Sequence, residues 1–264
     1  MNRLHVEVAG NGPPLVLLHG WAMHGGVFAP LVARLRETFT LHVVDLPGHG
    51  GSRGSDVPLA LAPGAAAVAD VVPDAPWLGW SLGGLVALHA AHAWPDRVPA
   101  LLMACASPRF VRGDDWPFGV SAEIFREFAA GLRSDYRGTL DRFIALEAFG
   151  SDHAREEIRA LRAEVLARGE PDAAVLADGL ELLEQTDLRA MLPALRVPSL
   201  WLSGRRDRLV DPRAMRDAAS LAPRAIAHVV EHAGHAPFLT HADAVATQVR
   251  AFLDDTRINA AAYG

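Results

Sequence analysis

A serine flanked by glycines lies between a short apolar segment and a segment with a helical pattern. The stretch Trp77-Leu78-Gly79-Trp80-Ser81-Leu82-Gly83-Gly84 has the spacing G-x-S-x-G, with an apolar segment before it and a helical pattern after it. This spacing is typical of a nucleophile on a sharp strand-to-helix turn, where small neighbours avoid collisions. The turn also brings the Leu82 amide and the helix dipole toward a developing oxyanion. We predict that Ser81 is a nucleophile, rather than an incidental serine in a glycine-rich turn.

A nucleophilic serine needs a base, and the base needs a group that orients it. His235 follows the last expected strand and Asp207 follows the strand before it, which gives the chain order Ser, Asp, His. That order is typical of this chemistry when the serine follows a sheet strand. In these roles His235 would take the serine proton and Asp207 would hold the imidazole in position. His232 and Asp211 are the nearest alternatives, although Asp211 precedes a proline and therefore looks like a helix start.

The second oxyanion donor is expected in Leu17-Leu18-His19-Gly20-Trp21, which follows an early apolar segment. We predict that the Trp21 amide joins the Leu82 amide, and that the His19 side chain is structural. Each such donor is typically worth about 10²–10³ in rate.

Metal chemistry has little support in the pattern. His232 with His235, and His89 with His92, have the spacing H-x-x-H, but neither pair has a glutamate after the first histidine or an obvious carboxylate ligand. Cys105 is the one cysteine and ends an apolar segment, so we expect it to be a small core residue. Because a serine, histidine and aspartate supply nucleophile and base, we predict neither metal nor cofactor.

Short apolar segments alternate with helical patterns over most of the chain. This alternation predicts an α/β fold, a mostly parallel sheet with helices on both faces. The expected strands are Leu15–Leu18, Leu41–Val44, Trp77–Gly79, Ala100–Ala104, Ser199–Leu202 and Ile226–Val230. The expected helices are Val27–Arg36, Leu82–Ala93, Pro212–Leu221 and Asp243–Leu253. The first segment, Leu4–Val8, is predicted to be an antiparallel edge strand.

Strand signals vanish between about residues 110 and 190, where apolar residues recur at helical spacing. A helical block inside an α/β alternation indicates an inserted lid. We therefore predict a core of residues 1–110 and 188–264, with a helical lid over residues 111–187.

One expected lid helix places three arginines on a single face: Arg155, Arg159 and Arg162. Arg142 and Arg137, on the preceding helical pattern, could extend this patch. Like charges one turn apart are mildly destabilising, by about 0.2–0.5 kcal/mol per pair. The patch is either a docking site for an anionic partner or the solvated surface of a chain whose 25 basic residues are all arginine.

Composition limits the remaining possibilities. The formal net charge of −6 argues against non-specific nucleic-acid binding. No apolar run reaches the roughly 18 residues expected of a membrane span. A single cysteine and the lack of a signal-peptide pattern fit a reducing compartment. We expect a cytoplasmic protein, most simply a monomer, that binds neither nucleic acid nor membrane.

The whole chain resembles the α/β-hydrolase superfamily, and within it the BioH family. Members of that family are carboxylesterases that cleave the methyl ester of pimeloyl-acyl-carrier protein in biotin synthesis. The superfamily likeness includes the turn Val43-Val44-Asp45-Leu46-Pro47-Gly48-His49-Gly50-Gly51-Ser52. The family likeness is carried by Leu17–Trp21, by Trp77–Gly84, by Arg142-Phe143-Ile144-Ala145-Leu146 and by Ala233-Gly234-His235-Ala236-Pro237-Phe238.

The resemblance implies that Ser81, Asp207 and His235 form a catalytic triad and that Trp21 and Leu82 line the oxyanion site. It also implies that Phe143, Ile144, Ala145, Leu146 and Glu147 border the acyl channel. Arg142, Arg155 and Arg159 would match basic lid residues that grip the acidic carrier protein. The family can have a further basic residue at Gly138, where this chain has Arg137 alongside; one residue turns a helical side chain by about 100°.

The predicted function is hydrolysis of a carrier-bound pimeloyl methyl ester. A broad short-chain carboxylesterase, or a non-catalytic receptor on a hydrolase fold, would be compatible with many of the same residues. A serine at position 81 disfavours haloalkane dehalogenases and epoxide hydrolases of this fold, which need a carboxylate nucleophile.

Overall fold

A computed structural model of the protein describes residues 4–263. Within these residues the strands form one sheet of seven strands in the order β1-β3-β2-β4-β5-β6-β7. The strands are β1 Val6–Ala9, β2 Pro14–Leu18, β3 Thr40–Val44, β4 Trp77–Trp80, β5 Leu101–Ala104, β6 Ser199–Gly204 and β7 Ala225–Val230. Every pairing is parallel except that of β1 with β3, which is antiparallel. The predicted α/β sheet with an antiparallel edge strand is therefore confirmed.

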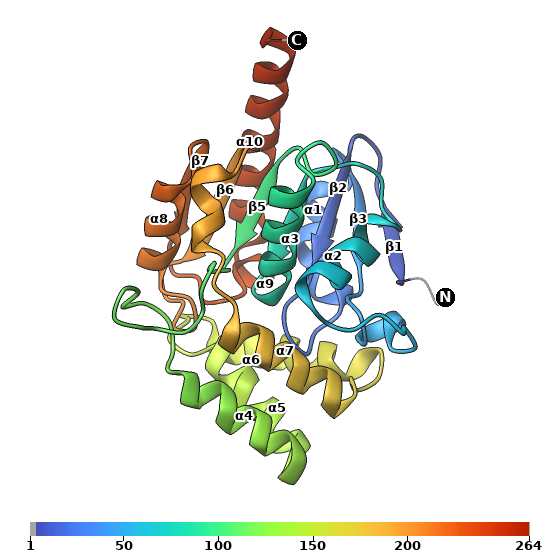
Figure 1. The fold of residues 1–264 in the computed structure, drawn as a ribbon. Coiled ribbons are helices and arrows are strands. Elements are labelled where there is room, and N and C mark those ends of the chain that lie inside the picture. The colour runs from blue at the N-terminus through green and yellow to red at the C-terminus, as the bar shows by residue number, and fades with distance from the viewer. Residues whose placement is uncertain (1–3, 264) are drawn as a thin grey trace.

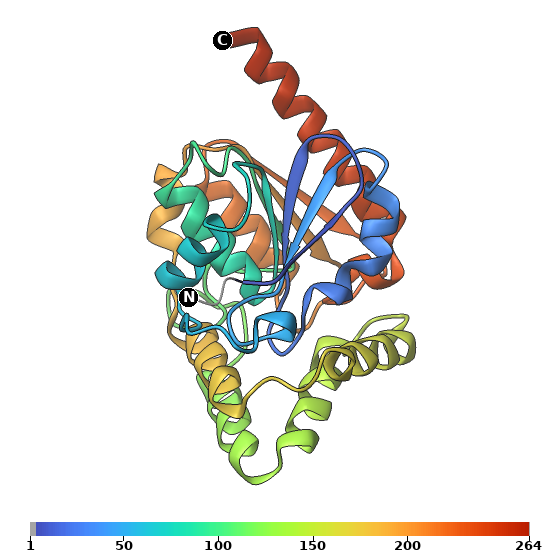
Figure 2. The ribbon, with the colours of Figure 1, turned by 90° about the vertical axis from the view of Figure 1, so that its right-hand side faces the viewer.

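Helices cover both faces of the sheet. The α-helices of the core are α1 Ala29–Leu35, α2 Leu61–Ala69, α3 Leu82–Ala93, α8 Pro212–Leu221, α9 Pro237–Thr240 and α10 Ala242–Tyr263. Three short 3-10 helices accompany them: η1 Gly25–Phe28, η2 Gly50–Ser52 and η3 Arg189–Ala194. Helices α2 and α3 lie on the face toward the viewer in Figure 1, whereas α1 and α10 pack together on the opposite face, as Figure 2 shows. None of the helices in the described part of the chain has the length and apolarity that a membrane crossing needs.

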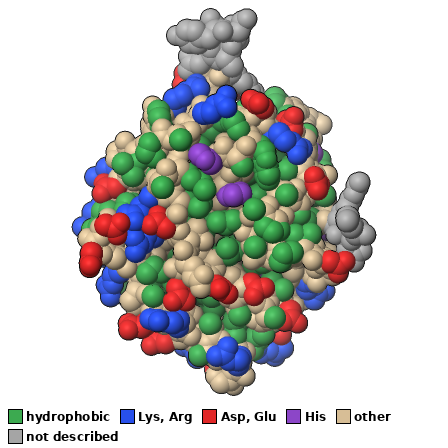
Figure 3. Space-filling model, viewed as in Figure 1, with side chains coloured by type: hydrophobic (Ala, Val, Ile, Leu, Met, Phe, Trp, Pro, Cys, Tyr) green, Lys and Arg blue, Asp and Glu red, His purple; other side chains and the backbone are tan. Residues whose placement is uncertain are grey.

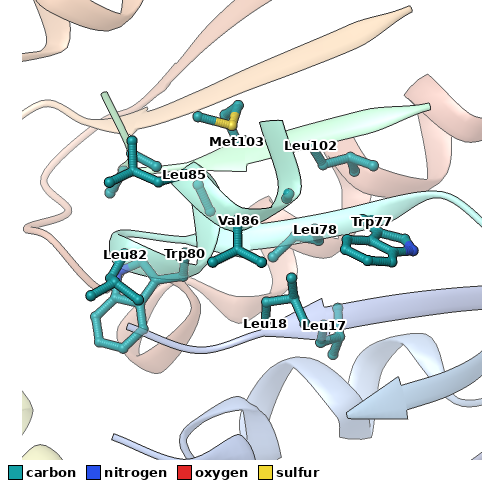
Figure 4. Packing of buried hydrophobic residues seen from close by; sticks show 14 of the residues in the cluster. Leu17, Leu18, Trp77, Leu78, Trp80, Leu82, Leu85, Val86, Leu102 and Met103 are labelled. Atoms are coloured by element: carbon teal, nitrogen blue, oxygen red, sulfur yellow. The ribbon is translucent and has the colours of Figure 1, made fainter. Parts of the chain in front are cut away.

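The central core fixes the turn that carries Ser81. Leu85 and Val86 of α3 lie among Leu78 of β4 and Met103 of β5 (Figure 4), and all four side chains are fully buried or nearly so. Burying one such side chain is worth about 1.5–3 kcal/mol. Packing of the apolar strand β4 and the buried side chains of α3 therefore fixes the position of Ser81, which lies between these two elements.

Helices α4 Ala122–Ser134, α5 Tyr136–Glu147, α6 Ala154–Ala167 and α7 Ala173–Gln185 follow β5 and precede β6. We call these helices the lid. In Figures 1 and 2 they lie beyond the end of the sheet at the bottom of the molecule, while the end of α10 projects from the top. The helical block expected between about residues 110 and 190 is present, and we retain residues 111–187 as the proposed extent of the inserted domain.

Candidate active site

Ser81 lies on the turn between β4 and α3 with a left-handed backbone, φ 53°. A non-glycine residue in that region is strained, and such strain is held only where the surroundings enforce it. The flanking glycines show the enforcement. A Cβ at Gly83 would lie 2.5 Å from the carbonyl oxygens of Leu18 and His19, and one at Gly79 would collide with the carbonyl oxygen of Gly83. Both glycines are therefore required for helix and strands to approach this closely.

The structure brings Ser81, His235 and Asp207 together. Nε2 of His235 lies 3.0 Å from Oγ of Ser81, and Nδ1 lies 2.8 Å from Oδ2 of Asp207. The other oxygen of Asp207 accepts hydrogen bonds from the amides of Leu209 and Val210, each at 2.9 Å. The carboxylate is thus fixed by its own loop and holds the imidazole with Nδ1 protonated and Nε2 free to accept the serine proton.

The surroundings of His235 suit a side chain that accepts a proton. Full burial acts to lower its pKa, but the charge of Asp207 and the hydrogen bond to it outweigh burial and raise the pKa above the ordinary value. Trp80 donates from Nε1 to the His235 carbonyl at 2.8 Å, and the two rings lie 5.6 Å apart. The ring is therefore held by both side-chain and backbone contacts.

The alternative residues of the sequence pattern lie elsewhere. Asp211 caps α8 through the amide of Arg213 and pairs with the guanidinium of the same residue. His232 is exposed and bonds to Asp152 at 3.0 Å. Neither side chain contacts Ser81.

Cys105 lies behind the candidate triad. Ligand-type atoms of Cys105, Asp207 and His235 are all within 4.8 Å of one another, a grouping that could in principle hold a metal ion. Burial and the nearby Asp207 raise the pKa of the Cys105 thiol well above its usual range, so the thiolate that a metal or a nucleophile requires is disfavoured. An ion there would also break the His235–Asp207 hydrogen bond. The grouping is better explained as the packed back of the site.

The two segments that carry the predicted oxyanion amides lie next to Ser81. Leu82 is the first residue of α3, and a Cβ built on Gly20, which precedes Trp21, would lie 3.2 Å from the Cβ of Ser81. The His19 ring is fully buried: its Nε2 accepts from the Leu46 amide at 2.9 Å, and its Nδ1 donates to the Gly20 carbonyl at 2.8 Å. Burial lowers the pKa of His19 to about 3. The neutral His19 ring therefore has the structural role that we predicted, because its hydrogen bonds connect the loop before Trp21 to Leu46.

The lid closes over this site. Phe143 on α5 packs against Trp21 with ring centroids 4.3 Å apart, and Nε1 of Trp21 donates to the Leu176 carbonyl of α7 at 2.8 Å. Ser81 and His235 are both 0% exposed. In this arrangement neither side chain is accessible to solvent, and the contacts of Trp21 with α5 and α7 belong to the cover over the site.

The predicted channel residues divide between two sides of α5. Phe143, Ile144 and Glu147 are buried and Leu146 is half-buried, whereas Ala145 is exposed. Five successive residues of a helix cannot share one face, and the role of all five residues at an acyl channel stays a prediction. Both carboxyl oxygens of Glu147 lack a hydrogen-bond partner among the described residues, and burial raises its pKa to about 8.

Glu157 is the notable residue that the sequence pattern did not single out. A helical projection groups it with Glu156 and Glu164 on one polar face, yet its side chain is only 1% exposed. It belongs to α6 of the lid and faces the loop that carries His235. A glutamate directly beside the apolar stripe of a helix was the available signal, but its burial depends on which core element the helix meets.

The predicted arginine patch is only partly unpaired. Arg142, Arg162 and Arg137 pair with Asp135, Asp141 and Glu170 respectively, at 3.3, 2.8 and 3.0 Å. Arg155 and Arg159 are exposed, and neither forms an ion pair in the part of the chain that the structure describes. Figure 3 shows acidic and basic side chains mixed over the lid end of one face. Of the five arginines of the predicted patch, Arg155 and Arg159 on α6 are thus the two without an ion pair among the described residues.

Known proteins resemble the chain over almost its full length. A family model described as alpha/beta hydrolase fold matches residues 13–242. A curated relative from Xanthomonas campestris pv. campestris, named pimeloyl-[acyl-carrier protein] methyl ester esterase, is 58% identical over 95% of this chain and 98% of its own length. A relative of the same name from Stenotrophomonas maltophilia is 56% identical over 95% of this chain and 96% of its own.

Solved structures share the fold at lower identity. An enol-lactonase from Burkholderia xenovorans has a TM-score of 0.83 and 25% identity, with 95% of this chain and 96% of that chain covered. An esterase from Exiguobacterium antarcticum has a TM-score of 0.84 and 23% identity, with 95% of each chain covered. At this identity the second likeness concerns the fold alone.

Proposed function

The chain belongs to the α/β-hydrolase fold family, and within it to the pimeloyl-[acyl-carrier protein] methyl ester esterases, and we therefore propose how its own residues carry out that reaction. The protein is a serine carboxylic ester hydrolase. Its substrate is a pimeloyl methyl ester borne by an acyl-carrier protein, and its products are the free pimeloyl carboxylate and methanol, a step of biotin synthesis.

The first half-reaction forms an acyl-enzyme. Oγ of Ser81 attacks the ester carbonyl carbon while Nε2 of His235, 3.0 Å away, takes the hydroxyl proton. Asp207, at 2.8 Å from Nδ1, stabilises the imidazolium that forms. The negative charge on the carbonyl oxygen is received by the amides of Trp21 and Leu82. Collapse of the tetrahedral intermediate breaks the bond to the methoxy oxygen, which takes the proton from His235 and leaves as methanol.

The second half-reaction releases the acid. A water molecule occupies the place that methanol left, His235 removes its proton, and the hydroxide oxygen attacks the acyl carbon. The bond to Oγ breaks, and the proton on His235 returns to Ser81. The balance needs only water, since base and nucleophile are side chains of the chain itself, and no cofactor enters the reaction.

Arg155 and Arg159 are the proposed docking side chains for the carrier. Both are exposed and lack an ion pair among the described residues, so an acidic partner can engage them without displacing a carboxylate of this chain. Arg142 is held by Asp135 in an exposed pair, which is worth about 0–1 kcal/mol and can exchange. Arg137, next to the position of Gly138 where the family can have a basic residue, is held by Glu170 in a pair that can exchange in the same way.

The observation that carries this proposal is the hydrogen-bonded series Ser81–His235–Asp207, in a chain 58% identical to an enzyme of the stated name. We also propose that the partner is the acyl-carrier protein and that the enzyme is cytoplasmic and monomeric. A broad short-chain esterase is the competing outcome of the test.

The test compares hydrolysis of pimeloyl-carrier methyl ester with that of p-nitrophenyl acetate. We expect Ser81→Ala to abolish both activities, and Arg155→Glu/Arg159→Glu to reduce only the first. Arg216→Glu/Arg224→Glu is the matched control, because it makes the same charge change at exposed residues outside the lid. Equal rates on the carrier substrate for the lid variant and the control variant would favour the broad esterase.

A further inference from the structure

Glu157 ties the lid to the segment that carries the base. Its Oε1 accepts hydrogen bonds from Oγ of Ser151 at 2.7 Å and from Oγ1 of Thr240 at 3.2 Å. Thr240 is the last residue of α9, and α9 begins two residues after His235. A carboxylate on α6 is therefore anchored within one short helix of the catalytic histidine.

The second oxygen of Glu157 faces the histidine loop itself. Oε2 is buried and has no hydrogen-bond partner among the described residues. A Cβ built on Gly234, the residue before His235, would lie 3.0 Å from this oxygen. An unpartnered buried carboxylate oxygen is costly, by about 1–3 kcal/mol or more. Such a group calls for a role beyond packing.

We infer that Glu157 is a positioning residue for the proposed triad, an ionised lid carboxylate that stabilises the protonated state of His235 while the serine attacks. It does not touch the reacting atoms. It acts through the imidazole, adding to the charge that Asp207 supplies directly at 2.8 Å. The arrangement is asymmetric, because Asp207 belongs to the core whereas Glu157 is delivered by the lid.

The groups that face the pair fit this role. Burial raises the pKa of Glu157 above its ordinary value, and the hydrogen bonds from Ser151 and Thr240 limit that rise because they favour the charged form. Glu147 on α5 also faces His235, but burial raises its pKa to about 8, so at neutral pH it is mostly uncharged. His153 is another titratable neighbour, and its charge would favour ionised Glu157. The His241 ring meets that of His153 edge to face, with centroids 5.5 Å apart. The buried thiol of Cys105 is the remaining neighbour.

Closure of the lid would then affect the basicity of His235 as well as the entry of substrate to Ser81. Ser81 and His235 are fully buried in the closed arrangement, so substrate entry requires the lid to move. Movement of α6 would take Glu157 away from the Gly234 loop, and closure would bring it back. The base would be at its strongest only when the lid covers a bound ester.

The test measures kcat/KM for p-nitrophenyl acetate against pH. This inference rests on the triad of the proposed function but not on the carrier protein, so failure of the carrier assay would leave it untouched. Glu157→Gln keeps an oxygen that can accept from Ser151 and Thr240 and removes the charge. Glu156→Gln is the matched control, because Glu156 is the exposed neighbour on the same helix. Removing a nearby carboxylate lowers an imidazole pKa.

We expect the acidic limb of the Glu157→Gln profile to move to lower pH by about half a unit or more. The plateau of kcat/KM should fall by about threefold to thirtyfold, since the imidazolium is stabilised less in the transition state. Glu156→Gln should match the unaltered protein. An unmoved acidic limb in folded Glu157→Gln would overturn the inference, even if the plateau fell, because a purely structural tie would not shift a titration.

A second variant covers the case in which Glu157→Gln does not fold. Ser151→Ala removes one hydrogen bond that favours the charged form but leaves the carboxylate and Thr240 in place. It should shift the acidic limb in the same direction by a smaller amount. An acidic limb that stays in place, or moves to higher pH, would contradict the role assigned to Glu157.

Discussion

Replacing Asp207 by asparagine tests the geometry of the site in a way that follows directly from its hydrogen bonds. Oδ1 of Asp207 accepts from the amides of Leu209 and Val210, whereas Oδ2 contacts Nδ1 of His235. The asparagine oxygen must take the Oδ1 place, because an NH₂ group there would oppose two amide donors. Its NH₂ group then faces Nδ1 of His235.

The asparagine therefore changes which nitrogen of the His235 imidazole carries the proton. Nδ1 must accept a hydrogen bond from the asparagine, so the ring proton moves to Nε2, the nitrogen that lies 3.0 Å from Oγ of Ser81. A protonated Nε2 cannot take the serine proton. The expected loss in kcat is about 10⁴, which corresponds to about 5.4 kcal/mol in the activation barrier.

The assay is steady-state hydrolysis of p-nitrophenyl acetate, with Asp211→Asn as the control. Asp211 caps α8 and lies outside the triad, so its variant should keep kcat and lose about 1 kcal/mol or less in the free energy of unfolding. If Asp207→Asn retained kcat within tenfold of the unaltered protein, the proposed orientation of His235 by Asp207 would be refuted.

Other predictions concern the base, the thiol and the turn. Because Asp207 raises the pKa of His235, kcat/KM should fall as pH is lowered through a midpoint above 6.5, the ordinary histidine value, since acid protonates the base; a midpoint well below that value in a pH–rate profile would contradict this. Cys105→Ala should keep esterase activity, and thiol reagents should not inactivate the native enzyme, because the thiol is buried and neutral; rapid inactivation would show the reverse. Gly83→Ala should cost about 1–3 kcal/mol or more in thermal or denaturant unfolding, because its Cβ meets the Leu18 carbonyl oxygen at 2.5 Å; unchanged stability would mean that the turn is less tightly packed.

The fold could be predicted where the sequence pattern is continuous. Buried parallel strands such as β2 and β5 are uninterrupted apolar runs, and the predicted helices α3 and α8 have the observed ends. Helix α2 was not predicted, because Leu61–Ala69 contains a proline and a glycine and has no clear polar face. Its helical state depends on packing against α3, which the local sequence does not encode.

The candidate site could be predicted because its three residues follow the ends of strands. Ser81, Asp207 and His235 each come directly after a strand or the loop beyond it, so a parallel sheet gathers them at one edge. The pairing of lid arginines was not predictable, because the partner of Arg162, Asp141, lies on another helix. The burial of Glu157 depends likewise on where α6 meets the core.

Covalent labelling of the nucleophile tests the central claim most directly. The protein would be treated with an alkyl fluorophosphonate, a reagent for activated serine nucleophiles, and the labelled peptide identified by mass spectrometry. The account predicts one label, on Ser81, with loss of esterase activity in step with labelling and no label in Ser81→Ala. A label on Cys105 or another residue, or activity that survives full labelling of Ser81, would contradict it.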